Sequence, residues 1–164
     1  MTLKKTAIPP FFEVHEQVAT GYKSLYALQA IQPATVLSSF HGELFTQPTR
    51  YTVQINANQH LELEPAHLRY TNHSCEPNVF FDTTKRQLVT LQPIKAGEEF
   101  TFFYPSTEWK MTEAFECGCN KTNCLGRIQG ANYLAYNQLE KYKLTAYVIE
   151  KFSELAMRQA KQFG

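Results

Sequence analysis

Three of the four cysteines in this chain lie close together, in a pattern that suits a bound metal ion. Cys117, Cys119 and Cys124 form a C-x-C-x4-C run, and such tight spacing lets thiolates converge on one cation. Structural zinc takes four ligands in a tetrahedron, and thiolates are among its preferred ligands. The remaining cysteine, Cys75, lies far upstream and completes the set only if the fold brings it back. The competing interpretation is four unrelated buried thiols, which protein interiors tolerate.

The composition is that of a folded chain without a marked basic surface. Its 164 residues are enough for one domain with a core and too few for two. Hydrophobic residues make up 43% and charged residues 19%, which favours folding over disorder. The net charge is only +1, whereas nucleic-acid binders usually carry a clear basic excess. We therefore expect no direct nucleic-acid binding.

The first residues superficially resemble a secretion signal, because Lys4 and Lys5 are followed by apolar side chains. The apolar run is too short for a signal core, and Pro9 and Pro10 interrupt it. No stretch approaches the roughly 20 apolar residues that span a bilayer. We expect an intracellular protein, in the cytoplasm or in a eukaryotic nucleus, with no membrane partner. Reducing compartments favour metal binding by cysteines over disulfides.

Short strand-like runs separated by turns predict a mainly β fold around these cysteines. Residues 51–55 and 60–63 alternate in polarity about a turn, which predicts a hairpin. Residues 79–82 and 87–91 predict a second hairpin. Residues 99–104 form an apolar run of strand length.

The end of the chain has the pattern of an amphipathic helix from Thr145 onward. Leu144, Val148, Phe152 and Leu155 recur at helical spacing. The charged residues opposite them are Glu150, Glu154, Arg158 and Lys161. This helix either covers a sheet or forms a dimer contact, so both a monomer and a dimer stay open.

Three motifs resemble those of SET-domain lysine methyltransferases. Residues 69–78, RYTNHSCEPN, resemble the family's R-x-x-N-H-S-C-x-P-N motif. Residues 94–104, IKAGEEFTFFY, resemble its I-x-x-G-E-E-L-x-x-D-Y motif. The cysteine run, with Gly126 after it, resembles the post-SET zinc segment of that family. The motifs occur in the family's order, and the resemblance covers roughly residues 12–128.

The resemblance implies a mainly β SET-domain fold of small curved sheets with a threaded, knot-like C-terminal segment, a post-SET zinc loop and a C-terminal helix. It divides the chain into a tail (1–11), a SET domain (12–112), a zinc segment (113–130) and a helical extension (131–164). In the family the cysteine of the N-H-S-C motif completes the zinc site, a role that falls to Cys75.

The implied activity is S-adenosylmethionine-dependent methylation of a lysine in a protein or peptide substrate. Tyr104 corresponds to the catalytic tyrosine, and Phe102 and Tyr104 correspond to the substrate pocket. The implied cofactor-binding residues are Tyr22, Lys23, Ser24, Leu25, Phe40, Arg69, Asn72, His73, Tyr104 and Leu125. A phenylalanine at position 102 leaves room for further methyl groups, which predicts dimethyl or trimethyl lysine.

The chain departs from the family pattern at three places near the expected site. Tyr22 to Ser24 stand where the family has G-x-G, Phe103 stands where it has Asp, and Phe40 stands where many members have Tyr. These departures support an alternative hypothesis, a zinc-containing SET-like binding module with weak catalysis or none.

Overall fold

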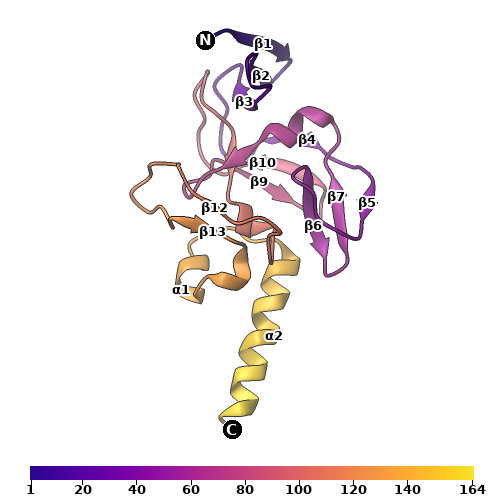
Figure 1. Cartoon of the computed structure of the whole chain (residues 1–164), viewed down its shortest axis with the longest axis vertical. Coiled ribbons are helices and arrows are strands. Elements are labelled where there is room, and N and C mark those ends of the chain that lie inside the picture. The colour runs from indigo at the N-terminus through magenta and orange to yellow at the C-terminus, as the bar shows by residue number, and fades with distance from the viewer.

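The protein is built mainly from short β-strands, as the sequence predicts. The computed structural model describes residues 1–164. Thirteen strands form five small sheets, three of them with three strands and two with two. The long helix α2 (Ala146–Gln162) projects from one end of the molecule (Figure 1). None of the helices is both long and apolar enough to cross a membrane.

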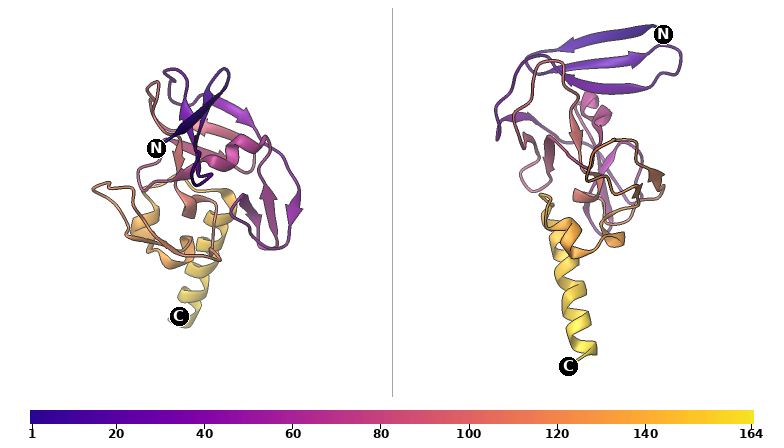
Figure 2. Two further views of the ribbon diagram at one scale, coloured as in Figure 1. Left: turned by 45° about the horizontal axis from the view of Figure 1, so that its top comes forward. Right: turned by 90° about the vertical axis from the view of Figure 1, so that its left-hand side faces the viewer.

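The first sheet is an antiparallel meander of β1 (Leu3–Ile8), β2 (Phe12–Gln17) and β3 (Lys23–Ala27). Side chains alternate between the faces of a strand, so Phe12 and Val14 are buried in the core. The sheet lies at the opposite end of the molecule from α2 (Figure 2). The segment that we expected to be a tail therefore includes a paired strand.

Both predicted hairpins are present. Their strands are β6 (Thr52–Asn56), β7 (Gln59–Glu62), β9 (Val79–Asp82) and β10 (Gln87–Thr90). A third strand extends each hairpin, β5 (Leu44–Phe45) beside β7 and β4 (Val36–Ser39) beside β10. Only β10 alternates strictly between buried and half-buried side chains, whereas β6 and β9 each bury three consecutive residues.

The predicted strand over residues 99–104 is much shorter than expected. Only β11 (Thr101–Phe102) pairs, and it lies parallel to β8 (Asn72–His73). The chain then turns into a 3-10 helix, Tyr104–Ser106. Pro105 has no amide hydrogen for a ladder, and the Tyr104 N–H donates to a side chain, so the strand cannot continue.

The remaining elements are short, and all but one follow β11. Antiparallel strands β12 (Phe115–Glu116) and β13 (Arg127–Ile128) enclose the cysteine run. The short helices are the 3-10 helices Ala66–Tyr70 and Ala131–Tyr133 and the α-helix α1 (Tyr136–Leu139).

Two apolar clusters hold the fold together. The main core has 17 buried side chains, all between Phe12 and Phe102, with Phe81, Leu88 and Phe100 fully enclosed. The second cluster has only four buried members, Phe103, Ala131, Leu139 and Val148.

Helix α2 does not cover a sheet, so that alternative for the C-terminal helix is wrong. Val148 is the one buried residue of α2, and it belongs to the second cluster. Phe152 packs against Trp109, with ring centroids 5.1 Å apart. The first turns of α2 are therefore anchored, and the later turns extend away from the body (Figures 1 and 2).

Candidate active site and metal centre

The fold brings Cys75 back to the other three cysteines. The four sulfur atoms lie within 4.8 Å of one another, although Cys75 is 42 residues before Cys117. The Sγ atoms of these two residues are 3.9 Å apart, far longer than a disulfide bond. A tetrahedral site with Zn–S bonds of about 2.3 Å holds its sulfurs about 3.8 Å apart. The predicted cluster is confirmed, and its geometry fits a zinc ion.

Backbone hydrogen bonds shape the cysteine loop around this cluster. The Leu125 N–H points at the Cys75 Sγ at 3.4 Å, and the Gly126 N–H points at the Cys124 Sγ at 3.5 Å. Such N–H contacts stabilise metal-bound thiolates. Burial raises the pKa of the Cys75 thiol, so a bound cation is what would hold it as thiolate.

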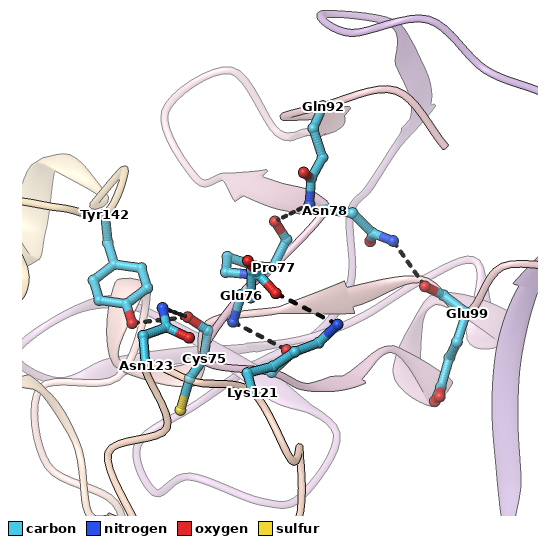
Figure 3. A network of polar contacts seen from close by, with 10 residues as sticks. Cys75, Glu76, Pro77, Asn78, Gln92, Glu99, Lys121, Asn123 and Tyr142 are labelled. Carbon is cyan, nitrogen blue, oxygen red and sulfur yellow. Dashed lines mark hydrogen bonds and ion pairs between the residues drawn. The ribbon is translucent and has the colours of Figure 1, made fainter. Parts of the chain in front are cut away.

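The loop is also docked onto the segment that carries Cys75. The Asn123 side-chain amide donates to the Cys75 carbonyl oxygen at 2.8 Å, and Lys121 pairs with Glu76 at 3.4 Å (Figure 3). The Glu76–Lys121 pair is exposed and adds little, because solvent screens it. The amide bond is short and partly buried, so it is the more important of the two.

His73 connects the metal centre to Tyr104. The parallel pairing of β8 and β11 aligns His73 with Phe102, two residues before Tyr104. The Tyr104 N–H donates to His73 Nδ1 at 3.1 Å, and His73 Nε2 lies 3.4 Å from the Cys75 Sγ. Burial lowers the pKa of His73 to about 4, so the ring is neutral at pH 7. Since Nδ1 accepts, the ring proton is on Nε2, facing the sulfur.

Aromatic rings surround the side chain of Tyr104. The ring centroids of Phe102, His73 and Phe115 lie 4.7, 5.1 and 5.8 Å from that of Tyr104. Burial is the main reason that the pKa of Tyr104 rises to about 12. The hydroxyl is therefore protonated at pH 7 and available as both hydrogen-bond donor and acceptor.

Two cavities meet at Tyr104. One has a volume of about 980 Å³ and the other about 860 Å³. The residues that line both are Tyr22, Arg50, Asn72, Tyr104 and Phe115. Tyr104 therefore belongs to the wall of both cavities.

The structure gathers most of the residues predicted from the sequence at these cavities. Besides the shared Tyr22, Asn72 and Tyr104, the first cavity is lined by Lys23, Arg69 and Phe102, and the second by His73. The Arg69 guanidinium pairs with Glu64 and lies 3.6 Å from Glu62, so much of its charge is already neutralised.

Four of the predicted residues do not line either cavity. Ser24 and Leu25 are buried in β3. Phe40 is only 2% exposed and packs edge-on against Phe81 in the main core. Leu125 contacts the second apolar cluster instead.

Sequence reasoning missed Glu108, which lines the first cavity. Its Oε2 atom accepts hydrogen bonds from the Gln54 N–H at 3.1 Å and from the Thr107 hydroxyl. Burial raises the pKa of this carboxyl to about 7. The only sequence signal for Glu108 is its position four residues after Tyr104. In the structure the Glu108 N–H donates to the Tyr104 carbonyl oxygen.

Arg50, Phe115 and Glu99 were missed as well. Arg50 and Phe115 lie outside the three motifs, so nothing in the sequence pointed to them. Glu99 lies inside the second motif and accepts a hydrogen bond from the Asn72 side-chain amide at 2.9 Å. This bond fixes the amide at the wall of the second cavity.

The chain was compared with known proteins. The SET domain family matches residues 11–105. The Methyltransferase flvH of Aspergillus flavus is 33% identical over 150 residues, which cover 90% of this chain and 84% of that protein. A match of that length must extend well beyond residue 105, into the cysteine loop and the C-terminal extension.

Other relatives are much longer proteins. Histone-lysine N-methyltransferase met-2 of Caenorhabditis elegans is 37% identical over 37% of this chain and 5% of its own length. Histone-lysine N-methyltransferase Set2 of Drosophila melanogaster is 38% identical over 38% of this chain and 3% of its own length.

Among solved structures, the crystal structure of KRYPTONITE in complex with mCHG DNA and SAH is similar, with a TM-score of 0.52. The match covers 68% of this chain and 27% of that one at 20% identity, so it supports the fold alone. Fold, motifs and relatives agree: the chain belongs to the SET-domain family of methyltransferases.

Proposed function

We propose that this protein transfers a methyl group from S-adenosylmethionine to the side-chain amine of a lysine in a protein substrate. The observation that carries the proposal is the position of Tyr104 on the wall shared by two cavities. A methyl donor and a separate amine must meet at one point, and Tyr104 is the one residue of the 94–104 motif that lines both cavities.

The chemistry needs positioning more than it needs a nucleophile. The sulfonium of S-adenosylmethionine is already an activated donor, so the protein must hold the amine in line with the methyl group. The amine must also be neutral, and deprotonating a free lysine near pH 7.4 costs about 4 kcal/mol. The rings of Tyr104, Phe102 and Phe115 disfavour the ammonium form by desolvation, and the sulfonium charge adds to this.

On this basis we assign three of the predicted residues to the cofactor. Tyr22, Asn72 and His73 would hold the methyl donor in the second cavity, which the cysteine loop also lines. The KRYPTONITE structure, which has a similar fold, contains SAH, the product that such a donor leaves. The zinc ion would fix that loop and supply no chemistry of its own. In this proposal residues 12–112 form the catalytic domain, 113–130 the zinc segment and 131–164 the extension.

Tyr104→Phe tests the catalytic assignment. Turnover should fall more than about tenfold with little change in cofactor affinity, because the removed hydroxyl acts in the transition state. The assay is transfer of labelled methyl from S-adenosylmethionine into a native proteome. A whole proteome is used because the histone methyltransferases match this chain over only short parts of their own length and so do not identify its substrate. Tyr133→Phe, at a half-exposed tyrosine, is the matched control.

The outcomes separate the two hypotheses. If the native chain transfers methyl groups and Tyr104→Phe does not, the result supports the enzyme hypothesis. A thermal shift with S-adenosylmethionine but no transfer to any protein would favour the binding module, because a ligand of the native state raises its melting temperature. Near-normal turnover in Tyr104→Phe would contradict the role of that residue.

We propose dimethyl or trimethyl lysine as the product. Phe102 lines the first cavity, 4.7 Å from the Tyr104 ring, and has no hydroxyl to hold a partly methylated amine in one orientation. Phe102→Tyr should shift the product toward monomethyl lysine while keeping the first transfer. Mass spectrometry of a saturated reaction decides this, and exclusive monomethylation by the native chain would contradict it.

A further inference from the structure

Tyr142, in the C-terminal extension between α1 and α2, contacts both parts of the candidate site. Its ring stacks on Phe103 with centroids 3.6 Å apart and an angle of 4° between the planes. Its hydroxyl donates to the Cys75 carbonyl oxygen at 2.8 Å (Figure 3). One side chain therefore joins the neighbour of Tyr104 to a ligand of the metal centre.

The contact with Phe103 explains a departure from the family pattern. Phe103 stands where the motif has Asp, and it is only 2% exposed. An aspartate would offer no flat apolar face to a tyrosine ring and would bury a charge beside it. The aromatic residue at 103 is therefore matched to Tyr142, which lies 39 positions later in the sequence.

The contact with Cys75 is made from two separate segments. Asn123, in the cysteine loop, donates to the same carbonyl oxygen at 2.8 Å. Cys75 is itself fully buried, so its peptide has no solvent to replace either donor. The orientation of this metal ligand thus depends on a residue outside both the family match and the cysteine loop.

We propose that Tyr142 is a positioning residue that fixes Cys75 and Phe103, so that the C-terminal extension completes the site rather than merely following it. Loss of its hydroxyl loosens the metal ligand and the loop around it. Loss of its ring in addition frees Phe103 and, through the backbone, Tyr104. The consequence for methyl transfer rests on the proposed function, whereas the consequence for metal retention does not.

The test compares Tyr142→Phe with Tyr136→Phe in the zinc-loaded protein. Tyr142→Phe keeps the ring on Phe103 and removes only the hydroxyl, so the fold is retained. Tyr136 is in the same extension but 70% exposed, which makes it the matched control. Zinc release to a coloured chelator should be about five-fold faster in Tyr142→Phe, the factor expected for one lost hydrogen bond. Tyr142→Leu should release zinc faster still.

A second measurement separates positioning from general packing. Amide exchange of residues 73–76 and 121–126 should accelerate in Tyr142→Phe, while strands β9 and β10 keep their protection. Unchanged zinc release and unchanged exchange in Tyr142→Phe would overturn the proposal. If the native chain held no zinc, the zinc assignment would fail, and the exchange measurement alone would then support or overturn the role of Tyr142.

Discussion

The main core and the C-terminal region are stabilised by different means. Between Phe12 and Phe102, 17 buried apolar side chains from several small sheets form one continuous core. From Phe103 onward the one apolar cluster has only four buried members, and the four clustered cysteines provide a second source of stability. A short segment that cannot bury enough apolar surface needs another source of stability, and metal binding supplies it.

The candidate site residues lie where these two regions meet. Tyr104 follows the last strand of the main core and precedes the second cluster, and His73 lies between it and Cys75. Tyr104 is therefore positioned by apolar packing on one side and by the cysteine cluster on the other. If this comparison is right, disturbing the two regions should have separable effects.

The largest expected effect is on the C-terminal region after metal removal. Structural zinc contributes roughly 10 to 16 kcal/mol of apparent binding free energy in zinc-finger peptides. Chelation, or Cys119→Ser, should therefore unfold residues 113–130 locally while the main core stays folded. Hydrogen exchange read by mass spectrometry reports both regions at once. Re-adding zinc should restore protection after chelation but not in Cys119→Ser, and simultaneous loss of protection throughout the chain would contradict the comparison.

A smaller effect is expected when a main-core ring is removed. Phe81 is fully buried, and its ring lies edge-on to Phe40 and Phe102, with centroids 5.6 and 4.8 Å away. Phe81→Ala should lower the free energy of unfolding by about 4 kcal/mol, through lost burial and a residual cavity. Denaturant unfolding measures this loss. Val36→Ala, at a 47% exposed residue of β4, is the control and should change the same quantity by less than about 0.5 kcal/mol.

The smallest expected effect concerns Glu108, which joins the regions through its bond to Gln54. Because its pKa of about 7 in the folded state lies above the usual value, the unfolded chain loses this proton first as pH rises. Stability from this group is therefore present at pH 4 and declines between about pH 4.5 and 7. Glu108→Gln removes that decline, so its stability relative to the native chain should rise by about 2 kcal/mol between pH 5 and 8. A pH-independent difference in unfolding free energy would show that Glu108 does not titrate in this range.

Local patterns in the sequence were sufficient for a good part of the fold. Both hairpins were predicted because alternating side chains and turn residues are properties of a few consecutive residues. The helix after Thr145 was predicted for the same reason, but not what it packs against. An apolar stripe specifies that a helix has a partner, without specifying which one.

The prediction of a strand over all of residues 99–104 was wrong for a related reason. Its apolar composition suits a strand, yet a strand also needs a neighbour, and β8 offers only two residues to pair with. Phe40 was likewise assigned by analogy to a binding residue, although the apolar ring is stabilised more by packing on Phe81 than by facing a cavity.

The sequence by itself determined the family, the run of Cys117, Cys119 and Cys124, and the candidate role of Tyr104, because each depends on residue types at fixed spacing. Only the tertiary structure decided how they are held. The cluster of Cys75 with the later cysteines, the two cavities around Tyr104, the carboxyl of Glu108 and the stacking of Tyr142 on Phe103 all join residues distant in the chain. Spacing along the chain carries no information about such contacts, since they arise from how separate elements pack in three dimensions.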